Sequence, residues 1–162
     1  MEQLSLRFSG AILTSLFVAL ILSLIPLPEP FSIWQPEWVA LAVIHWGILF
    51  PKTSSYIVVF ITGLLIDSLS GTLLGQHSLG LVVVLYITLS LNRRLSAKTL
   101  MQQVFIILFA IGSYLAINYF MLNISHSKPK DWYYWAPLLS SIVAWPIAHR
   151  LLSMLHTSPR GL

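Results

Sequence analysis

Long apolar runs, separated by short polar or proline-rich stretches, make up nearly the whole chain. Crossing a hydrocarbon layer about 30 Å thick takes about 20 helical residues, or somewhat fewer where a helix is short or partly buried in protein. Six runs fit this pattern: 8–25, 37–50, 54–69, 72–91, 101–122 and 132–155. The pattern predicts an all-α membrane protein, a bundle of about six transmembrane helices that forms a single domain over residues 1–162.

The composition supports a membrane protein over a soluble one. Hydrophobic residues make up 57% of the chain and charged residues 9%, and the mean hydropathy is +0.83. Soluble domains carry about 25% charged residues, so the excess apolar surface must face lipid. The absence of cysteine excludes disulfides and thiolate metal sites. The net charge of +4 comes from few, scattered residues, so we expect no nucleic-acid partner.

The basic residues predict how the helices are oriented. With six spans, the side that holds both termini carries seven basic residues and the other side two: Arg7, Lys52, Arg93, Arg94, Lys98, Arg150 and Arg160 against Lys128 and Lys130. Lysine and arginine favour the cytoplasmic side of a membrane. We therefore expect both termini in the cytoplasm.

One carboxylate, Asp67, lies inside the apolar pattern, in the stretch GLLIDSLSGTLLG at residues 63–75. Intramembrane carboxylates mark proton or ion pathways, so Asp67 could belong to a relay. It could instead be structural, because a carboxylate just before a helix can accept hydrogen bonds from the free backbone N–H groups there. We favour the structural role, in which Asp67→Asn is largely tolerated and Asp67→Leu is not.

Glycines accompany Asp67 at four-residue spacing: Gly63, Gly71 and Gly75. Gly63 shares a helix face with Asp67 and is predicted to leave room for a neighbouring backbone. Gly71 and Gly75 form a pair of small residues that is typical of closely packed membrane helices, so we expect close packing there too.

Other polar residues within the runs are His45, Gln76, His77, Asn118 and His149. His45 and His77 could form a metal or proton site, but a metal site needs three or four ligands. Hydrogen bonds between helices are the favoured interpretation. His149, next to Arg150, is expected at the interfacial end of the last helix.

Motifs of enzymes are missing from the sequence. There is no GxSxG, Walker-type loop, HExxH or pair of carboxylates, so we expect no catalytic, cofactor-binding or metal-binding residues and no enzymatic activity. Pro146, beside Trp145, falls inside the last helix, where it frees a backbone carbonyl and bends the helix.

Taken in order, three stretches resemble the rod shape-determining protein MreD family of bacterial inner membranes: QPEWVALAVIHWGILFPK, which contains Trp38, then GLLIDSLSGTLLG, and the late WP at 145–146. The resemblance implies a non-enzymatic scaffold of the cell-elongation complex, needed for rod shape and lateral cell-wall synthesis. It further implies direct binding to MreC, and work alongside MreB, RodA and the cell-wall transpeptidase. The implied fold is similar to the substrate-binding subunits of energy-coupling-factor transporters.

The residues that the resemblance puts forward as structural or partner-binding candidates are Asp67, Gly63, Gly71, Gly75, Trp38 and Pro146. The alternative function is a small-molecule (vitamin-type) binding or transport subunit, with Asp67, His77 and Asn118 around its ligand. Ligand pockets normally need several convergent polar groups, and these runs supply few. We therefore expect the scaffold.

Overall fold

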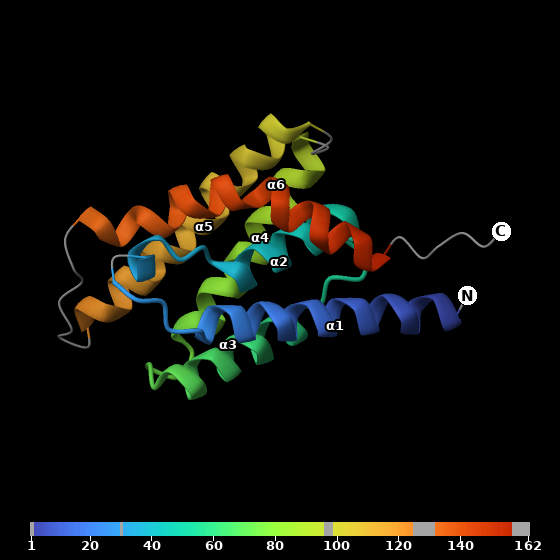
Figure 1. Ribbon diagram of the computed structural model, residues 1–162. Helices are drawn as coiled ribbons and strands as arrows, with labels where there is room; N and C mark the ends of the chain where they lie inside the picture. Colours follow the sequence, from blue (N-terminus) through green and yellow to red (C-terminus); the bar gives the residue numbers. More distant parts are fainter. Residues whose placement is uncertain (1, 30, 96–98, 125–131, 157–162) are drawn as a thin grey trace.

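The computed structural model describes residues 2–29, 31–95, 99–124 and 132–156, and these form a bundle of six α-helices with two short 3-10 helices (Figure 1). The elements are α1 (Glu2–Leu24), η1 (Phe31–Trp34), α2 (Trp38–Leu49), α3 (Tyr56–Ser70), α4 (Gln76–Leu95), α5 (Leu100–Ile124), η2 (Trp132–Trp135) and α6 (Ala136–His156). All six predicted helices are present. The largest difference is the start of α1, which lies six residues earlier than predicted, and α4 begins and ends four residues later than predicted.

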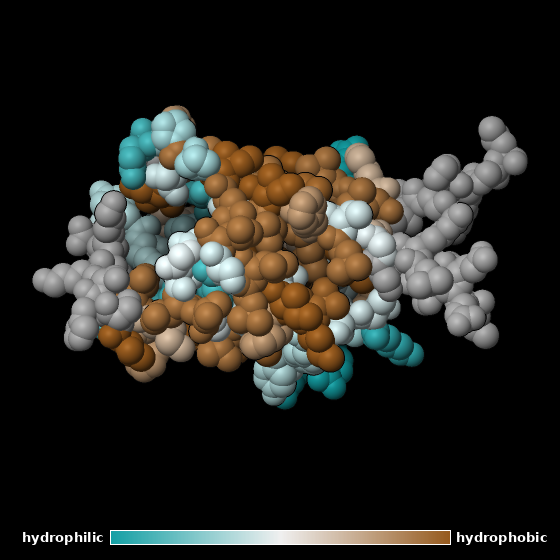
Figure 2. Space-filling model, turned by 90° about the horizontal axis from the view of Figure 1, so that it is seen from below, coloured by the Kyte–Doolittle hydropathy of each residue, from teal (hydrophilic) through white to brown (hydrophobic). Residues whose placement is uncertain are grey.

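Three helical stretches are long and apolar enough to cross a membrane: Gln76–Leu95, Leu100–Ile124 and Trp132–Leu155. Two shorter apolar stretches, Gly10–Leu24 and Tyr56–Ser70, accompany them. Figure 2 shows a broad band of hydrophobic residues across the middle of one face, with more hydrophilic residues toward its edges. Since large apolar side chains on α1, α3, α5 and α6 stay exposed, this surface suits a lipid environment.

Helix α2 forms the centre of the bundle. Its 12 residues extend over only about 18 Å at 1.5 Å per residue, which is less than the thickness of a bilayer. Every residue from Val39 to Ile48 is buried, and α2 contacts α1, α4, α5 and α6. A helix that is apolar on all sides is surrounded by protein or by lipid, and protein surrounds most of α2. The run predicted at 37–50 is therefore enclosed by protein, as the core around which the longer helices pack.

The two ends of the bundle differ in charge. The first turns of α1 and the last turns of α6 lie at the same end (Figure 1), here called the terminal end. It also holds Lys52, and Arg93 and Arg94 in the last turn of α4. The opposite end, called the Asp67 end, holds the α3–α4 turn, η1 and η2. Four of the basic residues used to predict the orientation, Lys98, Lys128, Lys130 and Arg160, lie outside the described residues.

Candidate functional site

Asp67 lies in the last turn of α3 and is only 1% exposed. Helix α3 ends because Gly71 adopts a left-handed conformation with φ of 65°, and the Gly71 N–H donates to the backbone oxygen of Asp67. The chain then turns over residues 71–75 and enters α4 at Gln76. This turn brings the start of α4 back beside the Asp67 side chain.

Both carboxylate oxygens of Asp67 accept hydrogen bonds from backbone N–H groups at the start of α4. The Gly75 N–H donates to Oδ2 at 2.8 Å and the His77 N–H donates to Oδ1 at 3.0 Å. Two hydroxyl groups add to these bonds, from Thr72 to Oδ1 at 3.0 Å and from Ser78 to Oδ2 at 3.3 Å. Since these N–H groups have no partner within the helix, the carboxylate satisfies them and holds the turn to α3.

The imidazole of His77 also binds Asp67, with Nδ1 2.7 Å from Oδ1. A carboxylate only accepts hydrogen bonds, so the proton of this bond lies on Nδ1. In the neutral ring that leaves Nε2 as an acceptor. Asp67 therefore sets the tautomer of His77 as well as the geometry of the turn. The interpretation of His77 and His45 as a joint site is not supported, because the partner of His77 is Asp67.

Gly63 allows α3 and α4 to approach closely. A Cβ atom built on Gly63 would lie 2.3 Å from Cα and 2.6 Å from N of Ser78. Both distances are too short for a side chain to be present at this position. Gly71 and Gly75 act differently from the prediction. Each has a positive φ, 65° and 97°, and neither would bring a Cβ within 4 Å of other atoms. The expectation of close helix packing at this pair is wrong, since both glycines serve the backbone of the turn.

A second carboxylate, that of Glu37, lies at the Asp67 end just before α2. The Tyr114 hydroxyl donates a hydrogen bond to it, and Tyr114 is in turn hydrogen-bonded to the Asn118 side chain. Gly80 makes room for the tyrosine ring, because a Cβ there would lie 2.6 Å from it. Neither Glu37 nor Tyr114 was predicted from the sequence. A carboxylate directly before an apolar run was the available signal for Glu37, whereas Tyr114 had none.

These polar groups surround open space. A cavity of about 700 Å³ lies between η1, the α3–α4 turn, α5 and the start of α6, and it includes Glu37, His77 and Asn118 in its wall. A neighbouring cavity of about 230 Å³ shares Glu37 and His77 and adds Tyr114. Among the described residues, no three histidine or carboxylate side chains gather closely enough to hold a metal ion. The arrangement suits binding through hydrogen bonds.

His149 lies against the buried His45, with Nδ1 of each ring 3.1 Å apart. One nitrogen must donate and the other accept, so the pair links α2 to α6. His149 was expected at the interfacial end of the last helix, and its bond to His45 was not predicted. His45 does hydrogen-bond between helices, as the favoured interpretation proposed.

The remaining candidate residues lie apart from Asp67. Trp38 begins α2 and packs, half-buried, against the core. Pro146 lies inside α6 on its exposed face, while its neighbour Trp145 points inward and donates a hydrogen bond from Nε1 to Oε1 of Gln103 at 2.8 Å. The structure thus brings Gly63, Gly71 and Gly75 together with Asp67 and does not bring Trp38 or Pro146 to it.

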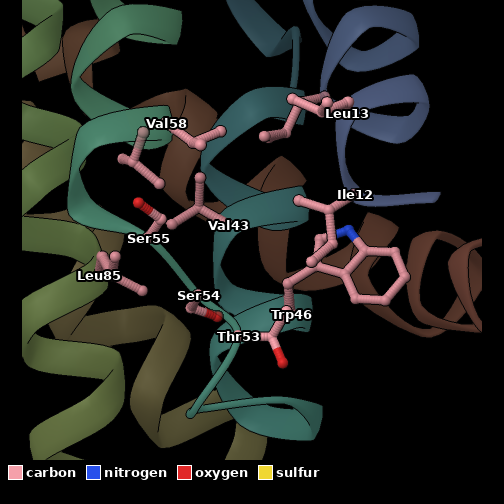
Figure 3. Close-up of a pocket in the computed structure, with 11 residues that line it drawn as sticks. Ile12, Leu13, Val43, Trp46, Thr53, Ser54, Ser55, Val58 and Leu85 are labelled. Carbon is pink, nitrogen blue, oxygen red and sulfur yellow. The ribbon is translucent and has the colours of Figure 1, made fainter. Parts of the chain in front are cut away.

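A small pocket of about 150 Å³ lies between α1, α2 and the start of α3 (Figure 3). Hydroxyl-bearing residues 53–55 form one part of its wall, and Val43, Val58 and Leu85 are among its apolar residues. The Trp46 indole N–H is already bonded to Oγ of Ser15 at 2.8 Å. Few polar groups are left to recognise a ligand, so we place the candidate site at the Asp67 end.

Comparisons with known proteins identify the family. The rod shape-determining protein MreD family matches residues 5–155. The rod shape-determining protein MreD of Haemophilus influenzae is 27% identical over 141 residues, which cover 83% of each chain. No solved structure matches, so the likeness to energy-coupling-factor transporter subunits stays a prediction. Because the family match extends over nearly all of the described helices, the chain belongs to the rod shape-determining protein MreD family.

Proposed function

We propose that this protein is a non-enzymatic scaffold of the bacterial cell-elongation complex, and that it binds MreC directly. The observation that carries the proposal is the family match over residues 5–155, which supports a role in determining rod shape. The proposed setting is the inner membrane, with a multi-pass chain whose termini are both cytoplasmic. In the wider complex it works with MreB, RodA and the cell-wall transpeptidase.

The hydrogen bonds of Asp67 support a structural rather than a transporting role. A proton or cation carrier needs a carboxylate that can exchange its partners. Asp67 is buried, and both of its oxygens are occupied by backbone N–H groups of Gly75 and His77. Releasing them would undo the start of α4.

We further propose that MreC, through its single span, docks in an apolar groove between α1 and α6. This groove has a volume of about 330 Å³ and is lined in part by small residues, Ala19, Ala42 and Ala148. Small residues let two membrane helices approach closely. Val18, which is 54% exposed, lies at this groove.

Co-purification of MreC with matched valine variants tests this proposal. Val18→Trp fills the groove, and we expect at least a tenfold loss of bound MreC together with rounded cells. Val143→Trp is the control, because Val143 is also exposed and does not line the groove. Full MreC binding by folded Val18→Trp protein would refute the docking surface. Absence of MreC from the wild-type preparation would refute the scaffold.

A small-molecule binding or transport subunit is the second candidate function. The observation that favours it is the cavity of about 700 Å³, whose wall includes His77 and Asn118. Mass spectrometry of the purified protein distinguishes the two. A soluble vitamin-like compound retained in equal amount to the protein would favour the carrier, and co-purified MreC without such a compound would favour the scaffold.

A further inference from the structure

The large cavity at the Asp67 end has a wall that is rich in hydrogen-bond acceptors. Glu37 contributes a carboxylate and Asn118 an amide side chain. Among the described residues the only ion pair joins Asp67 to His77, so no cationic side chain is paired with Glu37. A carboxylate in such a wall favours a ligand that brings positive charge.

Asn118 independently indicates that the ligand of this cavity is a hydrogen-bond donor. Its side chain is buried, 5% exposed, in the cavity wall, and its Oδ1 atom has no hydrogen-bond partner. An unsatisfied buried acceptor is costly. The terminal torsion of asparagine is soft, so a donor in the cavity can draw this oxygen toward it.

The remaining wall indicates an organic cation rather than a metal ion. Tyr133 and Tyr134 line the cavity, and aromatic rings attract ammonium groups. Ile33, Leu115 and Leu122 provide apolar surface beside them, which suits methylene groups. A volume of about 700 Å³ far exceeds what a bare ion needs.

We propose that this cavity binds a primary ammonium group, held by Glu37 and Asn118. Such a group occurs on amine-bearing phospholipids and on small soluble amines. The N–H donors of an ammonium group match the carboxylate of Glu37 and the amide oxygen of Asn118, which come from two different parts of the fold. The bound group would tie the segment between η1 and α2 to α5 at the Asp67 end.

Native mass spectrometry of the purified full chain tests the proposal with phosphatidylethanolamine, phosphatidylglycerol and free ethanolamine as probes. We expect about tenfold stronger retention of phosphatidylethanolamine than of phosphatidylglycerol, since a hydrogen bond to a charged group corresponds to at least such a factor. Ethanolamine that competes at millimolar concentration identifies a soluble amine as the ligand, and failure to compete identifies the lipid. Equal retention of the two lipids, without ethanolamine binding, overturns the proposal.

Matched variants locate the site. Glu37→Gln keeps an acceptor for Tyr114 and removes the charge, and Asn118→Leu removes the amide; each should abolish the preference for phosphatidylethanolamine. Asn123→Leu is the control, because Asn123 is on the same helix but exposed and outside the cavity wall. Melting temperatures in phosphatidylglycerol alone check folding. A preference that persists in folded Glu37→Gln protein overturns the assignment.

Two lysines of the chain itself require one more comparison. Lys128 and Lys130 are close in sequence to Tyr133 and lie outside the described residues. The double variant Lys128→Gln, Lys130→Gln should bind the amine probes as the wild type does. If only the double variant binds them, a lysine of this chain fills the cavity and the proposal of an external ligand is wrong.

Discussion

Replacing Gly63 with alanine is the sharpest test of how α3 and α4 are held together. The added Cβ would lie 2.3 Å from Cα of Ser78. Ordinary van der Waals contacts of a Cβ atom are 3.4 Å or longer. The obstacle is backbone, which cannot rotate away as a side chain can. The two helices must therefore separate by about 1 Å at this point. The same movement stretches the bonds of 2.8 and 3.0 Å from Gly75 and His77 to Asp67.

The cost follows from these two effects. Overpacking a well-packed contact costs about 1–3 kcal/mol, and losing one hydrogen bond to a charged group costs about 1.5–3 kcal/mol. Alanine is about 1 kcal/mol better than glycine inside a helix, which offsets part of the loss. We expect Gly63→Ala to lower the free energy of unfolding by about 2–4 kcal/mol.

Gly112→Ala is the matched control, because Gly112 also lies inside a helix and a Cβ there meets nothing within 4 Å. This variant should be neutral or up to about 1 kcal/mol more stable. Unfolding by sodium dodecyl sulfate in mixed micelles, followed by circular dichroism, measures both. If Gly63→Ala proves as stable as Gly112→Ala, the close contact between α3 and α4 is absent and the reasoning fails.

Three further predictions concern the turn and the topology. Gly75 has a φ of 97° and open space around it, so Gly75→Ala and Gly75→Leu should each lower the free energy of unfolding by about 1–2 kcal/mol in the same assay. A much larger loss for Gly75→Leu would indicate close packing instead of backbone strain. The sequence alone predicted that Asp67→Asn is tolerated, but the structure predicts a loss of about 1.5–3 kcal/mol, because the new NH₂ group must face an N–H that the carboxylate accepted. Wild-type stability would contradict the double acceptance. Reporter fusions should place residues 92–98 and the C-terminus in the cytoplasm and 124–131 outside; an external C-terminus would contradict the orientation.

The helices and the role of Asp67 at the α3–α4 turn were open to prediction because they depend on local pattern. Apolar runs locate the helices, and the spacing of Gly63 and Asp67 places both on one face of α3. The same spacing misled at Gly71 and Gly75, since glycines four apart look alike whether they lie on a helix or in a turn. Only the backbone φ values, both positive, separate the two cases.

Contacts between distant parts of the chain could not be predicted. Nothing near Glu37 in sequence indicates that Tyr114 will reach it, and nothing near His45 indicates His149. The burial of α2 was suggested only by its length, because an apolar run looks the same whether lipid or protein surrounds it. These features depend on how helices pack, which one sequence does not reveal.

The enclosure of α2 has a consequence for how the protein is made. When residues 38–49 leave the ribosome, three of the helices that later surround them, α4, α5 and α6, have not been synthesised. A segment of 12 residues is too short to be held stably across a bilayer by itself, and His45 meets His149 only when α6 arrives. We expect α2 to remain in contact with α1 or with the insertion machinery until the C-terminal half has entered the membrane. Nascent chains truncated before α6 should accordingly be degraded by membrane proteases rather than accumulate.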